Sequence, residues 1–170
     1  VENNQVAFGD QYTWSSYNPT THKVIYTQKA DKLTIMDGSS QIIFTINAND
    51  QVVSYEQTYA GSVQVLGKER ELITAQRAVE VLYLAGRISS KATVQSVKLS
   101  YYQSLVLKDF SIYSPAWYIE IRQADGQLIA RRVDAIHGTV LANETLETTN
   151  TQTQRTTTNN TTTTQSVQQQ

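Results

Sequence analysis

The clearest alternation of hydrophobic and polar residues lies at the start of the stretch PAWYIEIRQADGQLIARRVDAIHGTVL, residues 115–141. Trp117, Ile119 and Ile121 occupy every second position, which predicts a strand with one buried face. The residues between them are Tyr118 and Glu120, which would form the other face. We therefore expect Trp117 to be buried together with the two isoleucines, against a helix.

Two turns divide the rest of this stretch into strands. Asp125-Gly126 favours the positive φ angles of a tight hairpin turn and would lead into a return strand at 128–133. His137-Gly138 predicts a second turn, where histidine tolerates a positive φ, before a third short strand at 139–141. The stretch therefore predicts a three-stranded antiparallel meander.

Further strands are predicted where Val, Ile, Thr and Tyr are concentrated. They are Lys23–Tyr26, Lys32–Met36, Gln41–Ile46, Val52–Leu66, Thr93–Tyr102 and Leu105–Leu107. Asp37-Gly38 should join the second and third of these as a hairpin, and Asn47–Asp50 should turn the third into the fourth. The long fourth strand should bend near Ala60-Gly61. Trp14 and Tyr17 should pack on the sheet.

One helix is predicted between the two groups of strands. Small and aliphatic residues recur there at helical spacing, at Ala75, Ala78, Val79, Leu82 and Ala85. Thr74 is a suitable N-cap, Ile73 can pack back onto Ala78, and Gly86 suits the left-handed residue after the helix. The helix is therefore expected at 75–85. The order strands, helix, strands predicts an α+β fold, with antiparallel β-sheet meanders packed around one main helix.

The composition changes at Asn143. Residues 143–170 are rich in Thr, Asn and Gln and cannot bury enough apolar surface to offset the entropy lost on ordering. We predict a disordered tail at 143–170, with a β-zipper as the alternative for such a tract. Residues 1–142 are predicted to form one α+β regulatory domain, or two small subdomains that meet near the helix at 75–85.

Candidate chemistry is sparse in this chain of 170 residues. The net charge of -1 and the lack of a basic stripe argue against nucleic acid binding. Cysteine is absent, and His22 and His137 each lack a second ligand at metal spacing. The sequence has no glycine-rich phosphate loop. We therefore expect no enzyme activity, no catalytic residues, no cofactor and no metal, and the sequence does not locate a partner-binding surface.

Two adjacent aromatic pairs leave two interpretations open. Tyr101-Tyr102 and Trp117-Tyr118 lie on predicted strands, so one ring of each pair should enter the core and the other should face outward. In the first interpretation these rings fill the core and pack across strands. In the second, they form an aromatic surface for a partner.

Several motifs in order make the chain resemble the YycI family, between about Tyr26 and Leu141. They are YEQTY at 55–59, AVEVLY at 78–83, LSYY at 99–102, SPAW at 114–117 and VDAIHG at 133–138. The chain departs from the family at Ser100, where the family often has Gly, and at Asp134, where it often has Asn. Neither departure removes a functional group, because the family has no catalytic residues.

The resemblance implies a single transmembrane helix before Val1 and a domain on the extracytoplasmic side of the cell membrane. It also implies two partners, a YycH-like protein and YycG (WalK), the sensor histidine kinase of a cell-wall-related two-component system of Gram-positive bacteria. In the family, kinase control is attributed largely to contacts among transmembrane helices, and its sign stays open.

A second resemblance leads to a different functional class. The ending VDAIHGTV is also similar to PepSY modules. The alternative function is therefore a secreted inhibitory or chaperoning module for a peptidase. The residues upstream of Val1 would discriminate between the two, since an anchor favours YycI and a cleaved signal peptide favours the free module.

Overall fold

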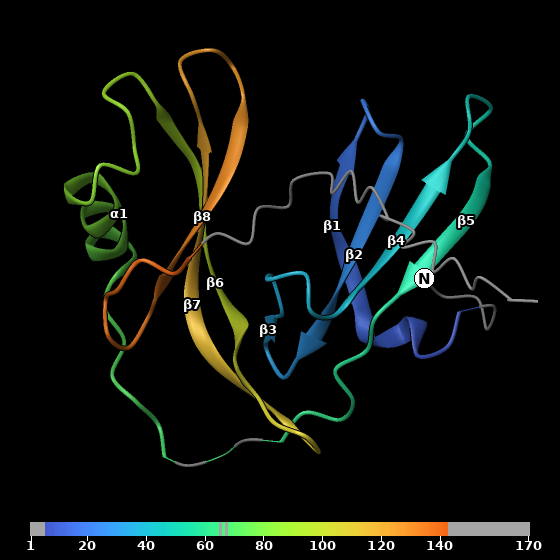
Figure 1. Cartoon of the computed structure of the whole chain (residues 1–170), viewed down its shortest axis with the longest axis horizontal. Coiled ribbons are helices and arrows are strands. Elements are labelled where there is room, and N and C mark those ends of the chain that lie inside the picture. Colours follow the sequence, from blue (N-terminus) through green and yellow to red (C-terminus); the bar gives the residue numbers. More distant parts are fainter. Residues whose placement is uncertain (1–5, 65, 67, 143–170) are drawn as a thin grey trace, which may run out of the picture.

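The computed structural model describes residues 6–64, 66 and 68–142. In chain order its elements are η1 (Gly9–Gln11), β1 (Tyr12–Asn18), β2 (Lys23–Ala30), β3 (Leu33–Thr34), β4 (Gln41–Ile46), β5 (Val52–Gln57), α1 (Ala75–Leu84), β6 (Thr93–Val106), β7 (Ser111–Arg122) and β8 (Leu128–Asp134). Within the described residues, two antiparallel sheets and one short α-helix make an α+β fold, which confirms the predicted class (Figure 1). The predicted tail at 143–170 lies outside the described residues.

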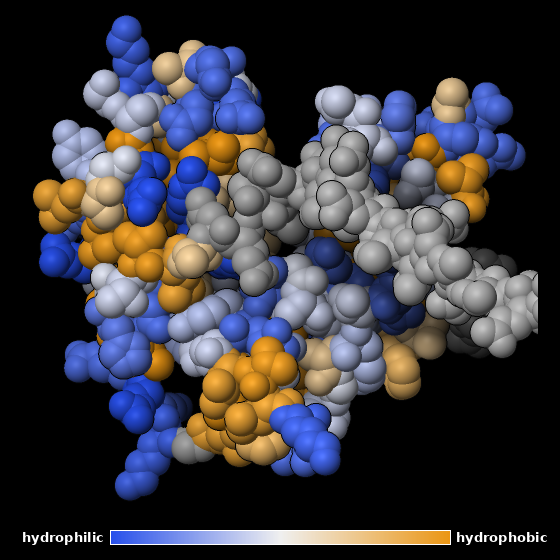
Figure 2. Space-filling model, in the orientation of Figure 1, coloured by the Kyte–Doolittle hydropathy of each residue, from blue (hydrophilic) through white to orange (hydrophobic). Residues whose placement is uncertain are grey.

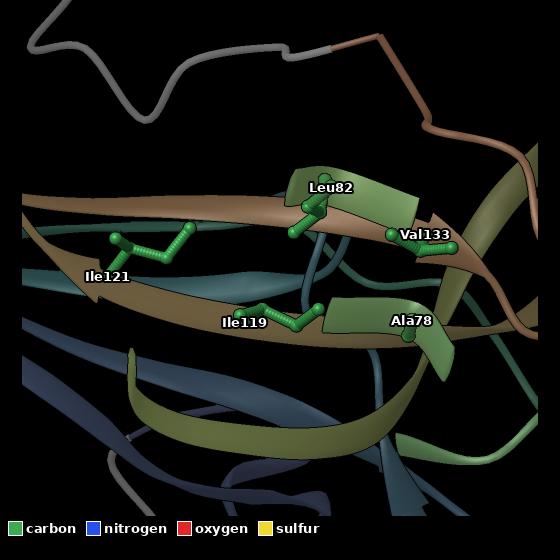
Figure 3. Close-up of a cluster of buried hydrophobic side chains, with 5 residues drawn as sticks. All are labelled: Ala78, Leu82, Ile119, Ile121 and Val133. Atoms are coloured by element: carbon green, nitrogen blue, oxygen red, sulfur yellow. The ribbon is translucent and has the colours of Figure 1, made fainter. Parts of the chain in front are cut away.

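The C-terminal sheet has the order β6-β7-β8 and is covered on one face by α1. Its core consists of fully buried side chains from α1, β7 and β8, namely Ala78, Leu82, Ile119, Ile121 and Val133. Figure 3 shows the two helix residues lying over the strand residues of this cluster. The period-2 pattern at Ile119 and Ile121 therefore predicted the buried face correctly. Trp117 packs at the edge of the cluster, and its Nε1 donates a hydrogen bond to the Ile73 carbonyl at 2.9 Å.

Both ends of α1 follow from its flanking residues. Thr74 is the N-cap, and its hydroxyl accepts a hydrogen bond from the Arg77 amide at 3.1 Å. After the helix Gly86 has φ 65°, and the Arg87 amide donates back to the Leu82 carbonyl at 2.8 Å. These caps confirm the predicted start and the role of Gly86. The helix ends at Leu84, and Ala85 is exposed instead of lying on the buried stripe.

The N-terminal sheet has the order β1-β2-β4-β5, with β3 paired to β2. The predicted turn at Asn47–Asp50 joins β4 to β5, and Asp50 takes a positive φ of 59°. The predicted hairpin at Asp37-Gly38 is wrong, because β3 pairs with β2 through Lys29 and Ala30 and β4 pairs with β2 as well. The Asp37 carboxylate accepts a hydrogen bond from the Gln103 amide, so this turn fastens the chain to β6.

The predicted strand Val52–Leu66 is also wrong beyond Gln57, where β5 ends. The buried side chain of Gln28 forms hydrogen bonds with backbone groups just beyond β5. In a longer strand these groups would pair with a neighbouring strand. Its Oε1 accepts from the Ala60 amide at 2.9 Å, and its Nε2 donates to the Gly61 carbonyl at 3.1 Å. The Ser40 hydroxyl donates to the same Oε1. The chain therefore leaves the sheet instead of bending within it.

The turns and strands of the C-terminal sheet differ in detail from the prediction. At both predicted turns only the glycine takes a positive φ, 87° at Gly126 and 67° at Gly138. The preceding acids, Asp125 and Asp134, accept hydrogen bonds from turn amides, so the turns need one left-handed residue each. The third strand at 139–141 is reduced to one bridge between Val133 and Val140.

β6 runs unbroken through the two strands predicted at 93–102 and 105–107, and ends at Val106. Register shifts interrupt its pairing with β7 at Val94/Ser96 and at Gln103/Leu105. The second shift coincides with the predicted gap between the two strands. A local irregularity therefore replaces a break in the strand.

The two sheets meet through β3 and β6. Ile35 is fully buried and bridges to Tyr101 in parallel, and the Met36 amide donates to the Tyr101 carbonyl at 3.0 Å. In Figure 1, α1 lies on the side of the C-terminal sheet that faces away from the N-terminal sheet. The contact between the sheets is therefore at β3, and division into two subdomains stays a prediction.

Candidate protein-interaction site

The two histidines singled out in the sequence both lie in turns. His22 lies in the turn before β2 with φ 52°, and His137 lies in the turn after β8, so the two histidines belong to different sheets. His137 Nδ1 is 3.1 Å from Asp134 Oδ1. In the described part of the chain, no group of three or more His, Cys, Asp or Glu side chains is placed to hold a metal ion.

Asp134 is the most heavily bonded of these polar groups. Its carboxylate accepts from the amides of Ile136 at 2.8 Å and His137 at 2.7 Å, and from the Tyr102 hydroxyl at 2.9 Å. Burial alone would raise the pKa of Asp134, but these hydrogen bonds together lower it below its usual value. Burial and the neighbouring carboxylate raise the pKa of Tyr102 to about 12. The hydrogen bonds of Asp134 therefore stabilise the turn after β8, and they already pair its carboxylate.

A different group of residues forms a partly exposed surface on the N-terminal sheet. Because residues opposite each other in an antiparallel pair point to the same face, the register identifies one side of this sheet. Trp14 lies opposite Tyr26, and Tyr17 lies opposite Val24. On the next strands Val24 lies opposite Phe44, which lies opposite Tyr55. We call the side chains of Trp14, Tyr17, Tyr26, Phe44 and Tyr55 the aromatic face.

A local irregularity in β1 creates this surface. Trp14 and Tyr17 are three residues apart, so strict alternation would place them on opposite sides of the sheet. The register of β1 against β2 shifts between Trp14 and Ser16, which brings both rings to the same side. The prediction that these two rings pack onto the sheet is wrong, because Trp14 is 61% and Tyr17 45% exposed.

Three rings of the aromatic face are in contact, and none of its five side chains is charged. The rings of Tyr26 and Phe44 meet edge to face at 5.8 Å, and those of Phe44 and Tyr55 lie 5.9 Å apart. Tyr55 is 48% exposed. The charged residues Lys23 and Glu56 alternate with face residues along β2 and β5 and so point to the opposite side of the sheet.

These properties are those of a protein-binding surface. Exposed apolar patches of neighbouring side chains commonly mark interaction sites, and tyrosine and tryptophan are enriched among the residues that dominate binding energy. An uncharged face has no ionised group to desolvate when a partner covers it. The arrangement offers rigid rings and hydroxyl groups for contact.

The aromatic pairs named in the sequence do not form such a surface. Tyr118 is only 8% exposed, and Trp117 packs on the core beside Ile73. Core filling therefore accounts for this pair, because Tyr118 is buried and Trp117 is half-buried against the core. Tyr101 and Tyr102 are half-buried, next to the contact with β3 and the Asp134 turn.

Two further groups of exposed apolar residues lie on the C-terminal half (Figure 2). One lies at the end of the β6–β7 hairpin and consists of Leu105, Val106, Leu107 and Phe110. The other lies along α1, where Tyr83 is 62% and Leu84 76% exposed. Among the described residues, no helix has the length and apolar character needed to cross a bilayer.

The comparison with protein families gives a match to one model. The model described as YycI protein matches residues 1–136. No curated protein matches the chain significantly. The family match covers both sheets and the helix, from before β1 to just beyond β8. The chain therefore belongs to the YycI family, which is associated with the YycFG two-component system.

Proposed function

We propose that this chain is the extracytoplasmic, protein-binding domain of a membrane-anchored regulator that modulates the sensor histidine kinase YycG (WalK) together with a YycH-like protein. The observation that carries the proposal is the family match over residues 1–136. The aromatic face supports it, because it gives the domain an uncharged surface suited to another protein. The domain acts by binding, without catalysis and without a cofactor.

The aromatic face is proposed as the contact with the YycH-like protein. Tyrosine and tryptophan rings lose little conformational entropy on binding because they have few rotatable bonds. The three most exposed rings lie on the two edge strands, Trp14 and Tyr17 on β1 and Tyr55 on β5. A partner that contacts all three must span the whole sheet, so its matching surface should be broad and apolar.

The first prediction tests this surface with Trp14→Ala combined with Tyr55→Ala. Both rings are about half exposed or more, so the fold and the thermal midpoint should change little. Binding to the purified YycH-like protein should weaken about tenfold or more, since rings that dominate an interface each contribute ~2 kcal/mol. Isothermal titration calorimetry of the two proteins measures the change.

A matched control removes apolar surface of similar exposure elsewhere. Phe110 is 56% and Leu128 52% exposed, and both belong to the C-terminal half. Phe110→Ala combined with Leu128→Ala should leave binding to the YycH-like protein unchanged. If this control weakens binding as much as the aromatic-face variant does, the assignment of the contact to the N-terminal sheet is wrong.

A further inference from the structure

A second surface of the molecule has the geometry of a peptide-binding groove. α1 contacts β7 and β8, and no strand among the described residues pairs with the outer edge of β6 between Thr93 and Ser100. The helix and this edge border an open depression of about 650 Å³. Its lining comes from α1, the following loop and β6, namely Gln76, Val79, Glu80, Tyr83, Leu84, Ile88 and Val94.

The lining determines which side chains fit. Five of the lining side chains are apolar or aromatic, and Glu80 is the single charged group among them. The Glu80 carboxylate is already paired with the Arg77 guanidinium at 3.2 Å and with the Gln76 amide at 3.1 Å. Charge complementarity therefore favours an occupant that is uncharged where it enters the depression.

The edge of β6 determines the backbone conformation of the occupant. An unpaired strand edge presents amide and carbonyl groups that can pair with one further strand. Farther along, this same edge already accepts added backbone, because Ile35 bridges to Tyr101 in parallel and the Met36 amide donates to the Tyr101 carbonyl at 3.0 Å. A segment placed beside Thr93–Ser100 would continue that line of pairing.

The side chains of such a segment would reach the depression at alternate positions. Val94 lies opposite Ile121 and so points to the helix-covered face of the sheet. A strand added beside Val94 would direct every second side chain to the same face, under Tyr83 and Leu84. Pairing along a strand edge supplies affinity, and the pockets for alternate side chains supply selectivity.

We propose that the groove between α1 and β6 binds an extended peptide segment of a partner protein, with aliphatic side chains at alternate positions, as an added strand of the C-terminal sheet. This site goes beyond the proposed contact at the aromatic face and shares no residue with it. The variants that test the two sites are therefore independent.

The test uses a fluorescein-labelled peptide, Lys-Val-Thr-Val-Lys-Val-Thr, and fluorescence anisotropy with the full chain. Two N-methylated versions carry methyl groups either on the valine amides or on the amides between them. Because neighbouring amides of a strand point to opposite edges, one version blocks pairing with β6 and the other leaves it free. Saturable binding of the parent peptide and of one methylated version alone is expected. Equal behaviour of both methylated versions, or no binding of the parent peptide, would overturn the proposal.

Two charge substitutions of matched exposure locate the site. Leu84 is 76% exposed and lines the depression, whereas Leu66 is 73% exposed and does not. Leu84→Glu should weaken binding of the parent peptide about tenfold or more, and Leu66→Glu should leave it unchanged. Circular dichroism should show both variants folded. Equal binding by the two variants would contradict the location.

Sedimentation tests whether a second copy of the chain occupies the groove instead. A dimer that Leu84→Glu separates, together with no peptide binding, would assign the groove to a second copy and overturn the peptide proposal.

Discussion

Asp134 shows how single side chains set the shape of this domain. Its buried carboxylate accepts hydrogen bonds from two turn amides and from the Tyr102 hydroxyl of β6. One side chain thus joins the last turn of the C-terminal sheet to its far strand. Since each of these hydrogen bonds favours the ionised form, the contribution of Asp134 to the free energy of unfolding depends on pH.

The prediction at this scale concerns acid stability. The pKa of Asp134 is lower in the folded chain than in the unfolded chain. Its stabilising contribution is therefore fully present above the ordinary carboxyl pKa of about 4 and is lost as pH falls through the lower folded pKa. Asp134→Asn should cost about 1–2 kcal/mol at neutral pH and flatten the fall in stability in acid. Urea unfolding at pH 7 and at successively lower pH measures both effects.

A second variant separates the carboxylate from the turn itself. Tyr102→Phe removes one of the hydrogen bonds that lower the pKa of Asp134 but keeps the ring and the turn. Tyr102→Phe should raise the pH at which the stabilising contribution of Asp134 is lost. This rise should be smaller than the rise caused by loss of all three hydrogen bonds. Identical pH dependence in the wild type and in Asp134→Asn would rule out a role for this carboxylate.

Single residues also explain which parts of the candidate site could be predicted. Ile119 and Ile121 follow a simple alternation and were assigned to the core correctly. Trp14 and Tyr17 do not, because the register shift in β1 depends on pairing with β2, which the sequence of β1 alone does not contain. Without that shift the two rings cannot be assigned to one face. The aromatic face was therefore missed.

At the scale of the elements, the end of β5 is set by a side chain of another strand. This side chain forms hydrogen bonds with the backbone where strand pairing stops. Gln28 on β2 is 1% exposed, and its amide bonds both the Ala60 amide and the Gly61 carbonyl. Ser40 and Gln28 also bond each other, so the network is satisfied within the interior. This arrangement directs the chain away from the N-terminal sheet and toward α1.

The prediction for this element uses Gln28→Met, which keeps the volume and removes the polar amide. The Ala60 amide would lose its strongest acceptor, and the Gly61 carbonyl would lose its donor. We expect faster hydrogen exchange at Ala60 and a loss of about 1–3 kcal/mol in the free energy of unfolding, because the remaining partners are left poorly satisfied. Exchange followed by NMR should show little change in α1. Unchanged exchange at Ala60 would contradict this role for Gln28.

Element types were predicted more successfully than element partners. β4 and the start of α1 agree with the sequence prediction because apolar periodicity and the Thr74 cap are local signals. The prediction of a hairpin at Asp37-Gly38 was wrong because β3 is short and its position depends on contacts with residues distant in the sequence. Ile35 packs against Tyr101, and Asp37 bonds the Gln103 amide. Such long-range pairings override the local turn signal.

At the scale of the whole molecule, the two proposed contacts lie on different sheets. The aromatic face belongs to β1, β2, β4 and β5, and the groove belongs to α1 and β6. The sheets are joined through Ile35 and Tyr101. Two binding surfaces on one connected domain could engage two partners at the same time. This arrangement suits the proposed role beside both a YycH-like protein and a kinase.

The last prediction concerns how the domain would act on the kinase. If contacts among membrane helices carry the signal, the domain alone should bind the kinase ectodomain weakly. Anchoring raises the effective concentration to roughly the millimolar range, so weak contacts suffice at the membrane. We expect full regulation of a kinase-dependent reporter in cells that express the anchored protein. Regulation should be partial with the anchor alone and small with a secreted domain. Anchored Trp14→Ala/Tyr55→Ala should reduce the regulation, and anchored Phe110→Ala/Leu128→Ala should preserve it. Full regulation by the secreted domain would contradict the helix-contact mechanism, and unchanged output after deletion of the whole gene would remove the kinase from the proposed function.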